Sequence, residues 1–225
     1  MVTSSATPRW IRLARIAFGL LGLFGLIWIP AQNLGVADWS IANYFSYFTI
    51  QSNVIGVLAL LVGGLLDPRS HRWQLFRGAA TLYLVITGVV YAVLLANIDV
   101  MLQDKWLNDL MHRLLPIVIL VDWLLVPSRL TVGARLVGVW LVYPVLYGVY
   151  TLVRGPIVDW YPYPFIDPRG QGYWSMTFGL VILVVVFALL AVAVAALGGI
   201  LGDRIGLSRN QDGKAVSSDS TASAP

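Results

Sequence analysis

The sequence lacks cysteine, and it also lacks glutamate, so all 11 of its acidic residues are aspartate. Without cysteine the chain can form no disulfide, no cysteine-ligated zinc site and no thiol nucleophile. Histidine is scarce as well, because His71 and His112 are the two that the chain contains. We therefore expect neither a bound metal nor another cofactor.

Charge is the next shortage. Charged residues make up 12% of the 225 residues, and hydrophobic residues make up 58%, whereas soluble domains carry about 25% charged residues. The net charge of +4 does not indicate nucleic-acid binding, because the basic residues lie at the ends of apolar segments and form no basic stripe. The composition predicts an integral membrane protein whose partners are membrane lipids.

Six apolar segments are long enough to cross the hydrocarbon core, which takes about 20 helical residues. Because only internally hydrogen-bonded backbone is stable in lipid, we expect an all-α, polytopic helical bundle. Residues 1–203 would form this six-helix domain, and the polar residues 204–225 a disordered cytoplasmic tail. The expected spans cover residues 11–29, 43–66, 78–97, 107–126, 133–153 and 174–201.

The distribution of Lys and Arg predicts the orientation. Most of these residues lie in the N-terminal segment up to Arg15, in or next to the loops after the second and fourth spans, and in the tail, all on one side of the membrane. By the positive-inside rule, both termini are then cytoplasmic. We expect a multi-pass protein of the cell membrane, such as the bacterial inner membrane.

Polar residues within the spans are candidates for function, because they are unfavourable in lipid. The span at 43–66 carries Ser46, Thr49 and Asn53, which share one face at 3.6 residues per turn. Such a stripe is also typical of hydrogen bonds between membrane helices, which are worth about 0.6 kcal/mol each. Both interpretations, a functional site and a helix contact, stay open.

The span at 107–126 begins with a polar cluster that contains Asn108, Asp109, His112 and Arg113. Asp109 and Arg113 have the i, i+4 spacing of a helical ion pair. Histidine is the side chain best suited to exchange a proton near neutral pH, which makes His112 a candidate general base. The alternative is a histidine that is merely hydrogen-bonded at the membrane interface.

The candidate residues of different spans are expected at a similar depth in the membrane. The spans at 43–66 and 107–126 both run inward from the outer side, so Thr49 and His112 are expected at similar depth. Tyr150 reaches the same level from the span at 133–153. A hydroxyl, an imidazole and a phenol would therefore share one slice of the outer leaflet.

Three segments together resemble the androgen-induced-gene type of integral membrane proteins and their bacterial six-helix relatives. The resemblance covers roughly residues 10 to 200 and is most specific in Trp-Leu-Asn, followed by a His and a Pro on the fourth span. The matching segments are Tyr47-Phe48-Thr49-Ile50-Gln51-Ser52-Asn53, residues 106–116 and Trp160-Tyr161-Pro162-Tyr163-Pro164-Phe165.

This resemblance implies hydrolysis of lipid esters. Animal members of the family cleave fatty-acid esters of hydroxy fatty acids with an intramembrane threonine nucleophile and a histidine. Carried over to this sequence, the histidine is His112, and the nucleophile is Thr49 or, in a gapless alignment through the polar residues, Ser46. A serine or threonine hydroxyl needs such a base to take its proton.

The sequence also offers candidate oxyanion donors for a hydrolase, and it leaves two other functions open. Asn53, Asn108 or Tyr150 would donate a hydrogen bond to the oxyanion or position the substrate. A small transporter or channel would instead use the charges of the fourth span as a polar path, and a scaffold would use the aromatic segment or the tail to bind another protein. The sequence identifies no particular protein partner.

The orientation is testable because the chain has no native cysteine. Single cysteines introduced at Asp38, Gln103 and Asp159 should react with a membrane-impermeant maleimide on intact cells, since these positions are expected outside. Cysteines at Ser70 and Ser218 should react only after lysis. Labelling of the Ser70 position from outside would contradict the predicted orientation.

Overall fold

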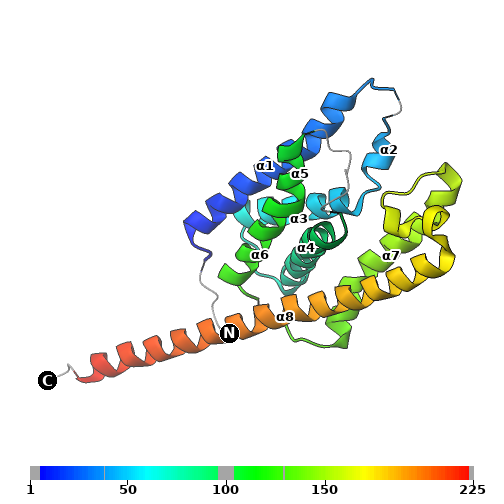
Figure 1. Ribbon diagram of the computed structural model, residues 1–225. Coiled ribbons are helices and arrows are strands. Elements are labelled where there is room, and N and C mark those ends of the chain that lie inside the picture. The colour runs from blue at the N-terminus through cyan, green and yellow to red at the C-terminus, as the bar shows by residue number, and fades with distance from the viewer. Residues whose placement is uncertain (1–5, 38, 96–103, 129, 223–225) are drawn as a thin grey trace.

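The computed structural model describes residues 6–37, 39–95, 104–128 and 130–222, with side chains up to Asp203. These residues form helices connected by loops and contain no strand, which confirms the predicted all-α class (Figure 1). The helices are α1 (Arg9–Asn33), α2 (Ile41–Tyr44), α3 (Phe48–Leu65), α4 (His71–Val90), η1 (Tyr91–Leu95), α5 (Lys105–Asp109), η2 (Leu110–Leu114), α6 (Leu115–Leu125), α7 (Ala134–Val158), η3 (Pro164–Ile166) and α8 (Pro168–Ala222).

Five of the described helices are long and apolar enough to cross a membrane: α1, α3, α4 with η1, α7, and α8 up to Asp203. The segment expected as a span at 107–126 is helical from Lys105 to Leu125, but it is divided into α5, the π-helix η2 and α6. The division precedes Pro116, which lacks an N–H group. The N–H of Leu115 bonds to the carbonyl of Leu110, five residues back, as in a π-helix.

The span expected at 43–66 is interrupted. α2 ends at Tyr44, α3 begins at Phe48, and Ser46 lies in the turn between them. Ser46, Thr49 and Asn53 therefore do not form the continuous helical stripe that the sequence predicts. The interruption places Thr49 in the first turn of α3, where backbone N–H groups have no partner within the helix.

Two helices continue through internal prolines, one of which, Pro30, directly follows the expected span at 11–29. Pro30 lies inside α1 and Pro144 inside α7. A proline leaves the carbonyl four residues earlier without its helical donor. Tyrosine hydroxyls supply that donor here, from Tyr44 to the carbonyl of Leu26 at 2.9 Å and from Tyr83 to the carbonyl of Trp140 at 3.0 Å.

Other boundaries also differ from the expected ones. α4 begins at His71, earlier than the expected residue 78, because the Ser70 hydroxyl caps it by accepting from the N–H of Trp73 at 3.2 Å. α8 contains a non-helical Gly172 and continues to Ala222. Its C-terminal part extends beyond the bundle in Figure 1. Helices in proteins gain most of their stability from packing, so the disordered tail at 204–225 stays a prediction for the protein in solution.

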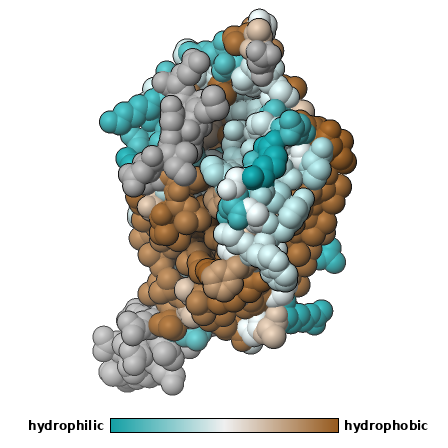
Figure 2. Space-filling model, turned by 45° about the vertical axis from the view of Figure 1, so that its right-hand side comes forward, coloured by the Kyte–Doolittle hydropathy of each residue, from teal (hydrophilic) through white to brown (hydrophobic). Residues whose placement is uncertain are grey.

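α4 lies at the centre of the bundle, where it contacts α3, α6, α7 and α8, while α1 packs along α3. Small residues permit this close approach. A Cβ atom at Gly19 of α1 would lie 2.6 Å from Leu61 Cδ2, and one at Gly22 would lie 2.6 Å from Val57 Cγ2. The outer faces of α1, α7 and α8 are apolar and exposed, and Figure 2 shows hydrophobic residues over a large part of the face in view.

A buried ion network joins α1, α4 and α6. From the sequence, Asp122 is expected to pair with Arg77, Arg129 or Arg135. Its carboxylate lies 3.7 Å from the Nε of Arg77, and closer still to Arg15 of α1, whose Nε donates to Oδ1 at 2.6 Å. Arg129 lies outside the described residues. Arg15 and Arg77 are 4% and 3% exposed. Asp122 is the carboxylate nearest to both, and Arg15 also lies 4.0 Å from Asp67, so the two guanidinium groups are neutralised mainly by Asp122.

Removal of Asp122 should therefore destabilise the protein strongly. Asp122→Ala removes the nearest carboxylate from two buried guanidinium groups and leaves Arg15 only the more distant Asp67 at 4.0 Å. We expect a loss of about 3–5 kcal/mol, or on the order of 10 °C in melting temperature for a chain of this size. Asp109→Ala is the matched control, because its pair with Arg113 is exposed and worth only about 0.3–0.5 kcal/mol. Thermal unfolding in one detergent compares the variants, and equal losses would contradict the role of the network.

Candidate functional site

Thr49 and His112 meet between α3 and η2. The Thr49 Oγ1 atom lies 3.3 Å from the His112 Nε2 atom. Both residues are buried, with exposures of 6% and 5%. Thr49 is in the first turn of α3, and His112 is in the middle of the π-helix that precedes Pro116. The structure thus brings together the two residues that the sequence places at similar depth.

The hydrogen bond of the second imidazole nitrogen, Nδ1, determines which nitrogen of His112 carries the proton. His112 Nδ1 lies 3.1 Å from the carbonyl oxygen of Asn108. A carbonyl oxygen only accepts hydrogen bonds, so Nδ1 carries the proton and Nε2 presents its lone pair to Thr49. The ring of Tyr91 stacks on the imidazole with the centroids 4.5 Å apart. The imidazole is therefore oriented to accept the Thr49 proton.

Tyr163 is the third member of the cluster. Its hydroxyl oxygen lies 3.3 Å from Thr49 Oγ1 and accepts the backbone N–H of Thr49 at 3.2 Å. Burial raises the pKa of Tyr163 to about 12, so the phenol keeps its proton at neutral pH. Tyr147 caps the preceding N–H, that of Phe48, in the same way at 3.1 Å. Sequence analysis missed Tyr163 as a site residue, although the aromatic density of residues 160–165 was a signal for it.

The segment that carries Tyr163, residues 160–165, is held from both sides, and we call it the lip. Tyr161 packs on Gly155, where a Cβ atom would lie 2.1 Å from the tyrosine ring. Arg169 lies over the Tyr161 ring and pairs with Asp167 at 2.7 Å. The hydrogen bond from Arg169 lowers the pKa of Asp167, which keeps this pair charged. The position of Tyr163 is therefore fixed by the ends of α7 and α8.

The other predicted site residues take different positions. The Ser46 hydroxyl bonds to the carbonyl of Ala42 at 2.6 Å and to the Tyr150 hydroxyl at 2.7 Å. Asn53 lies one turn below Thr49, but its amide nitrogen donates to the carbonyls of Thr49 and Met111, at 2.8 Å and 3.2 Å. Both of its N–H groups are thereby engaged, so Asn53 fixes α3 against η2.

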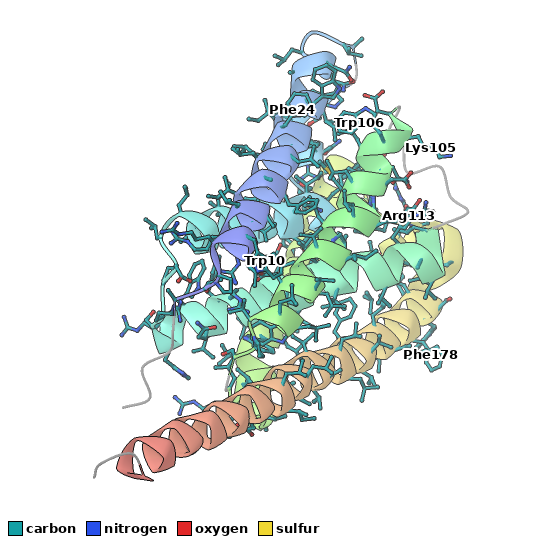
Figure 3. All side chains as sticks on the ribbon, turned by 90° about the vertical axis from the view of Figure 1, so that its left-hand side faces the viewer. Trp10, Phe24, Lys105, Trp106, Arg113 and Phe178 are labelled. Carbon is teal, nitrogen blue, oxygen red and sulfur yellow. The ribbon has the colours of Figure 1, made fainter. Side chains whose placement is uncertain are left out.

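Asn108 and the charged residues complete the surroundings of His112. The Asn108 amide donates to the hydroxyl of Tyr91 at 2.6 Å, which supports the ring that stacks on His112. Arg113 lies on the outer face of η2 (Figure 3) and donates to Asp109 at 2.7 Å. This confirms the predicted i, i+4 pair. Both charges are partly exposed, and the Arg113 guanidinium lies over the ring of Tyr91, 5.5 Å from its centroid.

An apolar cavity of about 230 Å³ adjoins Thr49 on the side of α7 and α8. Its wall consists mainly of aliphatic and aromatic side chains, and its polar wall residues are Thr49, Thr87, Tyr147 and Tyr163. Such a cavity with few polar groups is typical of sites for apolar small molecules. Within the described ranges, no three His or Asp residues gather as a metal site requires.

The comparisons with known proteins give no match. No protein-family model matches the chain, and neither a curated protein nor a solved structure does. The resemblance to the androgen-induced-gene type of membrane proteins stays a prediction. The interpretation of the site therefore depends on its geometry.

The tautomer of His112 is a direct test of this geometry. In a His71→Gln variant, His112 is the single remaining histidine, so its ¹⁵N signals are assigned without ambiguity. We expect a protonated Nδ1 and an unprotonated Nε2 at neutral pH, and a shift of the Nε2 signal in Thr49→Val, which removes the hydroxyl. A protonated Nε2 with a bare Nδ1 would contradict the proposed orientation of the ring.

Proposed function

We propose that the protein is an intramembrane acyl-ester hydrolase in which Thr49 is the nucleophile and His112 the general base. The observation that carries the proposal is the 3.3 Å contact between Thr49 Oγ1 and an Nε2 atom whose lone pair faces it. A hydroxyl, a base and a group that orients the base form the arrangement by which hydrolases activate a poor nucleophile. Ser46 lacks such a base among its hydrogen-bond partners.

In the first step, Thr49 Oγ1 attacks the ester carbonyl while His112 Nε2 takes the hydroxyl proton. The Nδ1–H bond to the Asn108 carbonyl stabilises the imidazolium that forms. Collapse of the tetrahedral intermediate breaks the bond to the alcohol oxygen, and Nε2 returns the proton to the departing alcohol. Water then cleaves the acyl-threonine by the reverse proton transfers and releases a carboxylic acid.

Tyr163 is the donor best placed for the oxyanion. Its oxygen already accepts the N–H of Thr49, so its own proton is available to a group beside Thr49 Oγ1. A donor that is fixed before the reaction stabilises the developing negative charge without reorganisation, an effect of about 3–4 kcal/mol in other hydrolases. The buried setting strengthens this interaction relative to water.

The membrane setting belongs to the same proposal. We place six spans in the cell membrane, with the helical segment from Lys105 to Leu125 as the fourth and both termini in the cytoplasm. Thr49 and His112 are then at the depth of the outer leaflet, where a lipid-like ester is available. The resemblance to the androgen-induced-gene type of membrane proteins agrees with this chemistry.

The arrangement of charges does not favour the transporter alternative. A polar path needs ionisable residues that follow one another through the bundle. Asp109 pairs with Arg113 near one end, Asp122 pairs with Arg15 near the other, and the positions between them include buried Leu115 and Ile119. The charges of the fourth segment are thus separated by apolar packing.

The proposed pair of Thr49 and His112 is tested by comparing the activity losses of the single variants with that of the double variant, which should not be additive. Thr49→Ala, His112→Ala and the double variant should lose ester hydrolysis by similar large factors, because neither residue works without the other. Thr49→Ser should retain part of the activity, and Ser46→Ala should have a milder effect. The assay uses purified protein in lipid nanodiscs with a panel of lipid esters, together with labelling by a fluorophosphonate probe.

Two outcomes would overturn the proposal. If Ser46→Ala abolished ester hydrolysis and Thr49→Ala retained it, the nucleophile would be Ser46. Wild-type protein that hydrolyses no ester and resists the probe would exclude the hydrolase and leave the scaffold as the candidate. Melting temperatures equal to that of wild type show that the variants are folded.

A further inference from the structure

The cavity beside Thr49 is elongated along α7. Its α7 wall extends from Leu141 to Leu152, which corresponds to about 16 Å at 1.5 Å per residue. Thr49 and Tyr163 line the side of the cavity next to the lip, which follows α7 in the chain, and the Thr49 N–H donates to the Tyr163 hydroxyl. The wall residues at the start of this α7 stretch, Leu141 and Pro144, are apolar. The cavity therefore has a polar side next to the lip and an apolar wall.

The side of the cavity between α7 and α8 reaches the outer surface of the bundle. Val145 and Val149 of α7 and Val184 of α8 all line the cavity, and their exposures are 47%, 53% and 47%. The same surface is hydrophobic and faces lipid in a membrane. An apolar ligand can therefore enter sideways from the bilayer, without passing through water.

The volume limits the size of the occupant. A cavity of about 150 Å³ holds benzene, or roughly 25 Å³ for each carbon atom. On that scale the cavity of about 230 Å³ holds roughly nine carbon atoms. This is the size of a medium-length acyl chain.

We propose that this cavity is an acyl-chain site that selects single-chain esters with acyl groups of about eight to ten carbons, with the carbonyl at Thr49 and the chain end near Leu141. The inference rests on the proposed function, since the hydrolase places the carbonyl beside Thr49. Gly148 is the specificity-determining position. It lines the middle of the cavity, and a Cβ atom there meets nothing within 4 Å.

Gly148→Leu tests the site, because leucine adds four carbon atoms to the cavity and leaves room for about five. We expect hydrolysis of a 4-nitrophenyl decanoate to fall at least tenfold relative to wild type, while hydrolysis of the butyrate changes less than about twofold. Gly138→Leu is the matched control. Gly138 also lies on α7 and a Cβ atom there meets nothing within 4 Å, but it is exposed and does not line the cavity.

A second measurement needs no turnover. Decanoic acid with a terminal diazirine is photolysed with the protein in nanodiscs, and the labelled peptides are mapped by mass spectrometry. We expect labels near Leu141 and Phe187 in wild type and in Gly138→Leu, and at least a tenfold weaker label there in Gly148→Leu. A phosphatidylcholine with the same diazirine chain serves as the competing probe.

The two measurements separate the inference from the proposed function. If wild type hydrolyses esters but Gly148→Leu keeps the ratio of decanoate to butyrate rates, or if the label lies elsewhere, the acyl site is wrong and the hydrolase stands. If no ester is hydrolysed but the label is lost in Gly148→Leu, the chain site stands and the hydrolase is wrong. Stronger labelling by the phosphatidylcholine would overturn the single-chain assignment, because the cavity would then hold a bilayer lipid.

Discussion

In lipid, every backbone N–H and C=O group needs a partner within the protein, and tyrosine hydroxyls supply many of these partners here. Tyr44 and Tyr83 donate to carbonyls that Pro30 and Pro144 leave without a helical donor. At the start of α3, where the helix is interrupted, Tyr147 and Tyr163 accept the free N–H groups instead. The same requirement thus stabilises the irregular backbone and brings a phenol next to Thr49.

The sequence was sufficient for the helical class and for the similar depth of Thr49 and His112, because these follow from apolar length and from position along two spans that both run inward. It did not show that the two side chains meet, and it left Ser46 open as the nucleophile. It did not indicate the interruption before α3 or the π-helix around His112. Both depend on contacts between distant segments, such as the Tyr147 hydroxyl with the carbonyl of Ser46, 101 residues apart. A periodicity of 3.6 residues assumes a regular helix, and for that reason it placed Ser46 on the same face as Thr49.

The ion network shows the same limit of sequence reasoning. Arg77 was a foreseeable partner of Asp122, because both lie near the ends of spans on the same side. Arg15 was not, although it makes the shorter contact, because it is separated from Asp122 by 107 residues and lies within the first apolar segment. Its burial is possible because the Gly63 carbonyl accepts a further hydrogen bond from it at 3.2 Å. Such compensation is visible only once α1, α3 and α6 are packed together.

The Thr49–His112 site and the ion network of Arg15 and Asp122 lie at opposite ends of α3. The residues that stabilise the fold are therefore distant from the residues of the candidate site. Thr49 is in the first turn of α3 and the Gly63 carbonyl that binds Arg15 is near its end, a separation of about 21 Å along the helix. Buried Val57 and Leu60 lie between them. Charges at the arginine end are thus too far away and too well paired to alter the proton affinity of His112. The groups that contact His112, namely Thr49, Tyr91 and the Asn108 carbonyl, instead orient the imidazole for its role as a base.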